Sequence, residues 1–276
     1  MATPTVTRTM VINDIHIPFH DSRLVTVSAE GMLLDIAEDL EVDRILLNGD
    51  VLDCYNWNSY GVHPEVQVDM ETEIYLGRCF FENLRKRFPD TEIVFLYGNH
   101  EYRYERWVIE KAKPMYNRLK LDADLGLERL GIEWYPYQFE YQLEQTNCYA
   151  VHSPPSYSVN GARASLLKKF DQTFLYACTH REQKACVTGG SGQVYAAYFN
   201  GWLGSVDETP SHRKVFSYRK GHVDWQHCFS IVTIVDGKDA HVNQISIRDH
   251  ACVVDGHYYD YSEDEVKDEF TYTKEV

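Results

Sequence analysis

The stretch RILLNGDVLD, residues 44–53, joins a short apolar run to a polar turn that contains one glycine and two aspartates. A short apolar run bounded by turn residues is typical of a buried β-strand. Gly49 tolerates backbone angles that other residues avoid, so the chain can bend sharply there and direct Asp50 into a crevice. The stretch therefore predicts a buried strand that ends in a potential functional site.

The same arrangement recurs on both sides of this stretch. Apolar runs at 9–12 and 92–97 are also followed by polar residues, which are Asn13-Asp14 and Gly98-Asn99-His100. Amphipathic stretches of helical length separate the three runs, at 24–40 and 68–88. This order is β-α-β-α-β, and sites in parallel α/β sheets form at the carboxyl ends of the strands. We therefore expect the three polar clusters to share one crevice.

The second half of the chain has a different pattern. A helical stretch runs from Glu101 to about Leu130, and short β-like segments with turn signals follow it. We expect these segments to form a second sheet, at 133–135, 147–151, 173–177, 193–199 and 229–235. Two mixed sheets packed face to face and flanked by helices make a layered α/β/β/α sandwich. We expect one domain over 1–254 and an acidic C-terminal tail over 255–276.

The composition is that of an ordinary globular protein. Hydrophobic residues make up 44% of the 276 positions, which is enough to bury a substantial core. The seven cysteines are scattered and form no CxxC pair, which argues against a disulfide framework. No segment has the length and apolarity of a signal peptide or a membrane span. We therefore expect a cytoplasmic protein without a membrane partner.

The polar clusters contain the groups that bind catalytic cations. Asp14-Ile15-His16 offers a carboxylate and an imidazole, and along an extended strand end both point to the same side. Asp50 adds a second carboxylate, and Asn99 adds an amide oxygen beside His100, which can hold or donate a proton. Hydrolysis of a phosphate ester needs charge neutralisation, an activated water and an acid for the departing oxygen. The clusters contain groups suited to all three tasks.

Three further residues extend the set. His152 and His180 each follow a β-like run, so two more potential ligands lie at strand ends of the second sheet. Asp53 lies three residues after Asp50, where it either orients a metal ligand or caps the next segment. Both interpretations of Asp53 remain open.

In this order the clusters resemble the signature of the calcineurin-like metallophosphoesterase family. That signature runs Asp-x-His, Gly-Asp-x-x-Asp, Gly-Asn-His-Asp/Glu, His and Gly-His-x-His. Four of the five blocks are intact here, and the match spans Asp14 to His180. The resemblance implies a hydrolase that cleaves phosphate esters with two divalent metal ions. Manganese, zinc, iron and nickel are the candidate metals.

The resemblance also implies a role for each matching residue. The first ion would be held by Asp14, His16, Asp50 and His180. The second ion would be held by Asp50, Asn99 and His152, so Asp50 is the shared ligand. His100 would contact the phosphate or protonate the leaving group, and Glu101 would orient His100.

The last block departs from the family pattern. Residues 177–180 are Ala-Cys-Thr-His in place of Gly-His-x-His, so the second ion lacks an expected imidazole. Cys178 either binds this ion as a thiolate, which favours zinc or iron over manganese or magnesium, or is a small hydrophobe that leaves a weak or empty second site. The sequence leaves both interpretations open.

The surroundings of the blocks bear on the choice of phosphate ester. Protein phosphatases of this superfamily have Arg-Gly where this chain has Cys54-Tyr55 and an arginine where it has Tyr97, which disfavours a protein substrate. Tyr55 and Trp57 either stack on a base near the metals or pack within their loop. Arg103 adds a positive charge for a phosphate, and the polar stretch 204–220 is expected to form a loop that reaches over the site.

We expect a phosphodiesterase or nuclease that acts on nucleotides or nucleic acid, with a phosphomonoesterase as the nearest alternative. The formal net charge of −15 repels nucleic acid, so bound cations would have to supply the local positive charge. An alternative of another class is a degenerate relative that binds a ligand or partner without turnover. The changed residue at position 178 is the feature that favours this alternative.

Overall fold

The first sheet contains the three strands expected around the 44–53 stretch. The computed structural model describes residues 3–57, 68–168, 172–190, 192–205 and 224–263. The parallel strands of the first sheet are β1 (Val6–Ile12), β2 (Arg44–Asn48), β3 (Glu92–Leu96) and β4 (Glu133–Tyr135). Beside β1, two antiparallel strands complete it, β10 (His227–Val235) and β11 (Asp239–Ile247).

The second sheet is also mixed. Its strand order is β5-β6-β7-β9-β8. The strands are β5 (Tyr141–Gln142), β6 (Cys148–Ala150), β7 (Thr173–Tyr176), β8 (Gln183–Thr188) and β9 (Val194–Phe199). Strands β6, β7 and β9 are parallel, and β5 and β8 are antiparallel to their neighbours.

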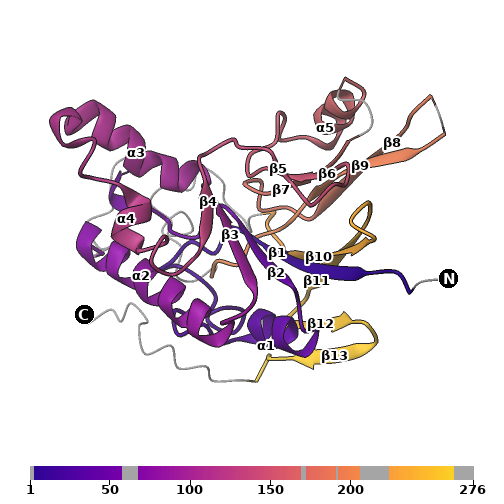
Figure 1. Cartoon of the computed structure of the whole chain (residues 1–276), viewed down its shortest axis with the longest axis horizontal. Helices are drawn as coiled ribbons and strands as arrows, with labels where there is room; N and C mark the ends of the chain where they lie inside the picture. Colours follow the sequence, from indigo (N-terminus) through magenta and orange to yellow (C-terminus); the bar gives the residue numbers. More distant parts are fainter. Residues whose placement is uncertain (1–2, 58–67, 169–171, 191, 206–223, 264–276) are drawn as a thin grey trace.

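Helices cover the outer faces of the two sheets (Figure 1). The first sheet is covered by α1 (Met32–Asp39) and α2 (Met70–Arg87), and the second by α5 (Val159–Leu166). Two more helices, α3 (Asn99–Lys111) and α4 (Leu121–Leu125), lie between β3 and β4 in the chain. Asp69 caps α2, since its carboxylate accepts a hydrogen bond from the Thr72 amide at 2.7 Å. The expected layered α/β/β/α sandwich is confirmed.

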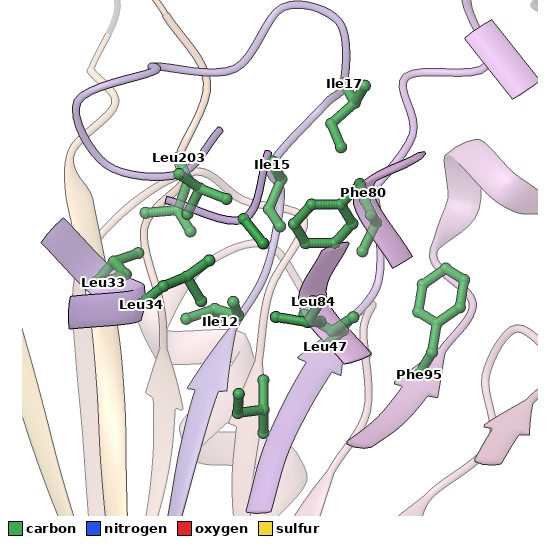
Figure 2. Packing of buried hydrophobic residues seen from close by; sticks show 14 of the residues in the cluster. Ile12, Ile15, Ile17, Leu33, Leu34, Leu47, Phe80, Leu84, Phe95 and Leu203 are labelled. Carbon is green, nitrogen blue, oxygen red and sulfur yellow. The ribbon is translucent and has the colours of Figure 1, made fainter. Parts of the chain in front are cut away.

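Alternation along the central strands explains the layers. Met10 and Ile12 of β1 belong to the cluster under α1 and α2, whereas Val11 between them packs toward the second sheet. Leu46 of β2 likewise faces the second sheet. Figure 2 shows the helix side of the first sheet, where strand residues Ile12, Leu47 and Phe95 lie near Leu33, Leu34, Phe80 and Leu84 of the helices. Strands buried on both faces in this way need continuous apolar runs, which the sequence has.

Two segments expected in the second sheet belong to the first. Glu133–Tyr135 is β4 and pairs in parallel with β3, and the expected 229–235 strand is part of β10, which pairs with β1. The expectation for these two segments was therefore wrong. Strand pairing depends on contacts between distant residues, and the local pattern of a short strand does not specify its partner.

The expected helices are also shorter in the structure. The 101–130 stretch is interrupted after Lys111, where Pro114 lies in a short 3-10 helix, and α4 ends before Gly126 with φ 72°. In the 24–40 stretch the helix begins only after Gly31. A Cβ atom at Gly31 would lie 2.8 Å from the Leu24 carbonyl oxygen, so the chain folds closely back on itself there.

The C-terminal part of the described chain forms a hairpin of β12 (Ala251–Val254) and β13 (His257–Asp260). The boundary expected between 254 and 255 lies in the turn of this hairpin. Tyr259 and Tyr261 pack against the main core, and the expected tail from residue 264 onward lies outside the described residues. Within the described ranges, no helix combines the length and apolarity needed to cross a membrane.

Candidate metal centre

The residues expected at the metal site all follow strand ends, and the structure brings them together. They come from the ends of β1, β2, β3, β6 and β7, in the order Asp14 and His16, Asp50, Asn99 and His100, His152, and Cys178 and His180. The first three strands belong to one sheet and the last two to the other. The site therefore lies where the carboxyl ends of both sheets meet.

Asp14, His16 and His180 form what we call the first cluster. The Nε2 atoms of His16 and His180 lie 3.2 Å apart. Asp14 Oδ1 lies 3.7 Å from His16 Nε2 and 3.3 Å from His180 Nε2. This oxygen is fully buried, yet it makes no hydrogen bond within the described part of the chain. A buried carboxylate oxygen that lies close to imidazole nitrogens but has no hydrogen bond is typical of a metal ligand. One carboxylate with two imidazoles fits a divalent cation.

Asp50, Asn99, His152 and Cys178 form the second cluster. His152 Nε2 lies 3.2 Å from Asp50 Oδ2 and 3.1 Å from Asn99 Oδ1. Cys178 Sγ lies 2.9 Å from the same Asn99 oxygen. Ligand atoms of Asp14, Asp50 and His152 all lie within 4.8 Å of one another, so Asp50 lies between the two clusters. This position fits a ligand that two cations share.

The backbone at the ligands is unusual. The φ angles are positive at five non-glycine residues of the two clusters: Asp14 at 50°, His16 at 58°, Asp50 at 52°, Cys178 at 66° and His180 at 57°. Left-handed backbone is uncommon for such residues and is concentrated at functional sites. The expectation that Asp14 and His16 lie on an extended strand end was wrong, because β1 ends at Ile12 and both residues are left-handed.

Two glycines are required by the close packing of the site. A Cβ atom at Gly49 would lie 2.3 Å from His152 Nδ1, and one at Gly98 would lie 2.1 Å from Asp50 Oδ1. Both distances are far below van der Waals contact. Gly49 also has a φ of 84°, so it provides both the sharp turn that the sequence predicts and room for an imidazole.

Hydrogen bonds outside the clusters fix the ligands. Nδ1 of His16 lies 3.0 Å from Asp53 Oδ2, and Nδ1 of His152 lies 2.7 Å from the Asn48 carbonyl oxygen. Each bond holds a proton on Nδ1 and leaves Nε2 to face the cluster. Asn13 donates to Asp14 Oδ2 at 2.6 Å. Of the two interpretations of Asp53, these contacts favour the one in which it orients a ligand.

Glu101 is buried at the first turn of α3. Its two carboxylate oxygens accept hydrogen bonds from the backbone amides of Gly98, Asp50 and Leu52, at 2.8, 2.9 and 2.9 Å. These bonds hold the turn around Asp50. Glu101 therefore positions the Asp50 turn, and the role expected for it from the resemblance, to orient His100, stays a prediction.

The neighbours of His100 are Asp53 and Arg103. His100 Nδ1 lies 2.6 Å from the Asp53 carbonyl oxygen, and Arg103 Nη2 lies 2.8 Å from His100 Nε2. His100 Nε2 is also 3.7 Å from Asp50 Oδ2. His100 therefore points its Nε2 edge at the clusters, with the Arg103 guanidinium beside it.

The aromatic residues near the site differ from those expected. Tyr55 is 7% exposed and Trp57 is 5% exposed, and Trp57 meets Tyr104 edge to face, which fits the packing alternative. Sequence reasoning missed Trp202, which stacks on His180 with ring centroids 5.4 Å apart, and Trp225 at 4.4 Å. Only contacts between residues distant in sequence identify these two tryptophans.

Of the expected 204–220 loop, residues 206–220 lie outside the described residues.

The charges of the clusters compensate one another. Burial lowers the pKa of His16, but hydrogen bonds to Asp14 and Asp53 outweigh burial and raise it to about 10. Burial raises the pKa of Asp50, but the charges of His100 and His152 outweigh it and bring the pKa below its ordinary value. Carboxylates and imidazoles thus stabilise each other's charged forms, and a cation would take the place of the imidazole protons.

Comparison with known proteins agrees with this geometry. A family model described as calcineurin-like phosphoesterase matches residues 7–272, which is nearly the whole chain. Comparison with curated proteins gave no match.

Proposed function

Because the chain belongs to the calcineurin-like phosphoesterase family, we propose that it hydrolyses phosphate esters with two divalent cations bound at the two clusters. One observation supports this most strongly. The Nε2 atoms of His16, His152 and His180 converge on the carboxylates of Asp14 and Asp50, from the strand ends of two sheets. Buried groups of this kind are costly to maintain unless they are paired or bind a cation.

The first cation would be held by Asp14, His16 and His180, the second by Asn99 and His152, and Asp50 would be shared. Manganese, zinc, iron and nickel all accept such nitrogen and oxygen ligands. When bound, the cations neutralise phosphate charge and lower the pKa of a bound water. The protein contributes the fixed positions of the ligands.

His100 would move a proton at its Nε2 atom. Because the Asp53 carbonyl oxygen holds Nδ1 at 2.6 Å, the imidazole is fixed with Nε2 toward the clusters. Because Arg103 Nη2 donates to Nε2 at 2.8 Å, Nε2 would exchange this donor for a proton before it contacts the phosphate or protonates the departing oxygen. Arg103 lies beside the same nitrogen, and its guanidinium would bind a phosphate oxygen.

We propose a phosphodiester of a nucleotide or nucleic acid as the substrate class. Arg103 is the guanidinium that contacts His100, whereas protein phosphatases of the superfamily have arginines at the positions of Cys54 and Tyr97. A diester phosphate has one negative charge and a monoester has up to two, so this reduced positive charge fits a diester better. Trp225 beside His180 offers an aromatic ring near the first cluster for a base.

Two chromogenic esters test the proposal. After chelation and re-addition of each metal, turnover of bis-p-nitrophenyl phosphate is expected to exceed that of p-nitrophenyl phosphate. Turnover of the monoester alone would replace the phosphodiesterase with a phosphomonoesterase. Less than one equivalent of bound metal, together with no turnover in any of the four metals, would favour the non-catalytic binding protein.

A further inference from the structure

Cys178 lies at the end of β7, at the position where the family signature has a histidine. Its Sγ atom is 2.9 Å from Asn99 Oδ1, and that oxygen is 3.1 Å from His152 Nε2. His152 Nε2 is in turn 3.2 Å from Asp50 Oδ2. Sulfur, amide oxygen, imidazole nitrogen and carboxylate oxygen from four different strand ends therefore follow one another in a series of close contacts.

The backbone fixes Cys178 in this place. Its amide donates a hydrogen bond to Asp14 Oδ2 at 3.0 Å, and its φ of 66° is left-handed. Asp14 belongs to the first cluster, so the same carboxylate that would face the first cation holds the backbone of Cys178. The sulfur is thus positioned by the metal centre itself.

The surroundings of Cys178 differ from those of a structural cysteine. Cys148 is 2% exposed and packs in the apolar layer between the two sheets. The Cys178 sulfur has polar neighbours, Asn99 Oδ1 at 2.9 Å and the Tyr157 hydroxyl at 4.0 Å. These contacts do not fit a small buried hydrophobe.

We propose that Cys178 binds the second cation as a thiolate. This inference rests on the proposed two-cation function. As the bond between metal and sulfur forms, the S–H bond breaks and its proton passes to solvent. Asp50, Asn99, His152 and Cys178 then form a set of two oxygens, one nitrogen and one sulfur.

A sulfur ligand selects the metal at the second position. Thiolates favour zinc and iron over manganese and magnesium, which prefer oxygen. The first cluster has no sulfur among its three members, so the two positions differ in preference. Tyr157, which is 60% exposed, would donate its hydroxyl proton to the sulfur, because a thiolate can only accept.

Cobalt(II) provides a direct readout of sulfur ligation. Metal-free full-length protein is loaded with two equivalents of cobalt, and the near-ultraviolet charge-transfer band from sulfur to cobalt is recorded. The band is expected in the native protein and in Cys186→Ser, a control at an exposed cysteine on β8. It is expected to vanish in Cys178→Ser and Cys178→His.

Zinc binding to the same variants gives a second readout. Cys178→Ser is expected to lower the affinity for one of two zinc ions by at least about 10- to 100-fold. This is the loss seen when a residue that only hydrogen-bonds to a metal ligand is removed. Cys178→His is expected to bind two ions again and to shift the second position toward manganese. This variant also keeps the assay informative if serine impairs folding.

The outcomes separate this inference from the proposed function. Two bound cobalt ions without a sulfur band, or a band that survives in Cys178→Ser, would overturn thiolate ligation and leave the two-cation site intact. Failure of the native protein to bind cobalt or zinc at all would overturn the two-cation function as well.

Discussion

In the first cluster two imidazoles face one carboxylate, whereas in the second a single imidazole meets an amide oxygen and a sulfur. Their supports differ too. A side chain, Asp53, holds His16 in the first cluster, but a backbone carbonyl at Asn48 holds His152 in the second. Metal affinity at the first cluster can therefore be lowered by a substitution at Asp53, which is not itself a proposed ligand. The support of His152 in the second cluster is a backbone carbonyl, which a side-chain substitution does not remove. Two positions in one centre need not bind the same metal or respond alike to mutation.

The largest expected effect comes from the residue between the clusters. Asp50→Ala removes the ligand that both cations share, so both should be lost and turnover should fall to background. Metal content and hydrolysis of the diester measure this. Asp90→Ala, at an exposed aspartate, is the matched control and should behave as the native protein. Retention of one tightly bound ion in Asp50→Ala would show that Asp50 is not a ligand shared by the two clusters.

His100→Ala tests a residue that faces both clusters and is not proposed as a ligand. Turnover should fall by about 10²- to 10⁴-fold, the usual cost of losing a general acid, while both cations remain bound. Single-turnover rates and metal analysis on the same sample distinguish the two effects. Full activity at unchanged metal content would remove His100 from the mechanism.

Asp53→Asn weakens the support of the first cluster alone. The amide replaces the carboxylate that orients His16, so affinity for the first cation should fall by about 10- to 100-fold. The sulfur-to-cobalt band of the second position should persist. Equal weakening of both cations would contradict the difference in support. Asp224→Asn, at an exposed aspartate, serves as the control.

The effect expected to be smallest for a change of one pH unit is the dependence of metal affinity on pH. In the metal-free protein His16 has a pKa of about 10 because Asp14 and Asp53 outweigh burial. The contribution of this raised pKa to the stability of the fold is complete below pH 6.5, the ordinary pKa of histidine. It is lost as the pH rises through about 10. A cation must displace that proton, so affinity for the first cation should rise over this range, by about tenfold per pH unit for one proton. Calorimetry in buffers of different ionisation enthalpy counts the protons released, and no release at pH 8 would contradict the shift.

The ligands could be predicted from sequence because each follows an apolar strand directly. Asp50 and Asn99 lie within three residues of their strands, so local pattern and the geometry of parallel sheets together place them at one edge. The supports could not be predicted in this way. Trp202 contacts His180 although the two residues are distant in sequence. Glu101 holds the Asp50 turn through backbone amides that lie 49 and 51 positions away in sequence.

The sheets show the same limit. The strands β1 to β3 alternate with helices, and this rhythm predicts a parallel sheet. The partner of β10 lies more than 200 residues away in β1, and nothing in the local pattern of residues 229–235 specifies it. The left-handed backbone at Asp14 and His16 was equally hidden, since it is imposed by the tertiary contacts of the site.

The first turn of α3 has one further consequence for the centre. The backbone amide of His100 binds Asp50 Oδ1 at 2.8 Å, so this oxygen is occupied by the helix. Oδ2 is the oxygen that faces His152, 3.2 Å from its Nε2 atom, so the helix fixes which oxygen of the carboxylate is turned toward the proposed cations. The first turn of α3 would thereby hold the carboxylate that both cations share in one orientation.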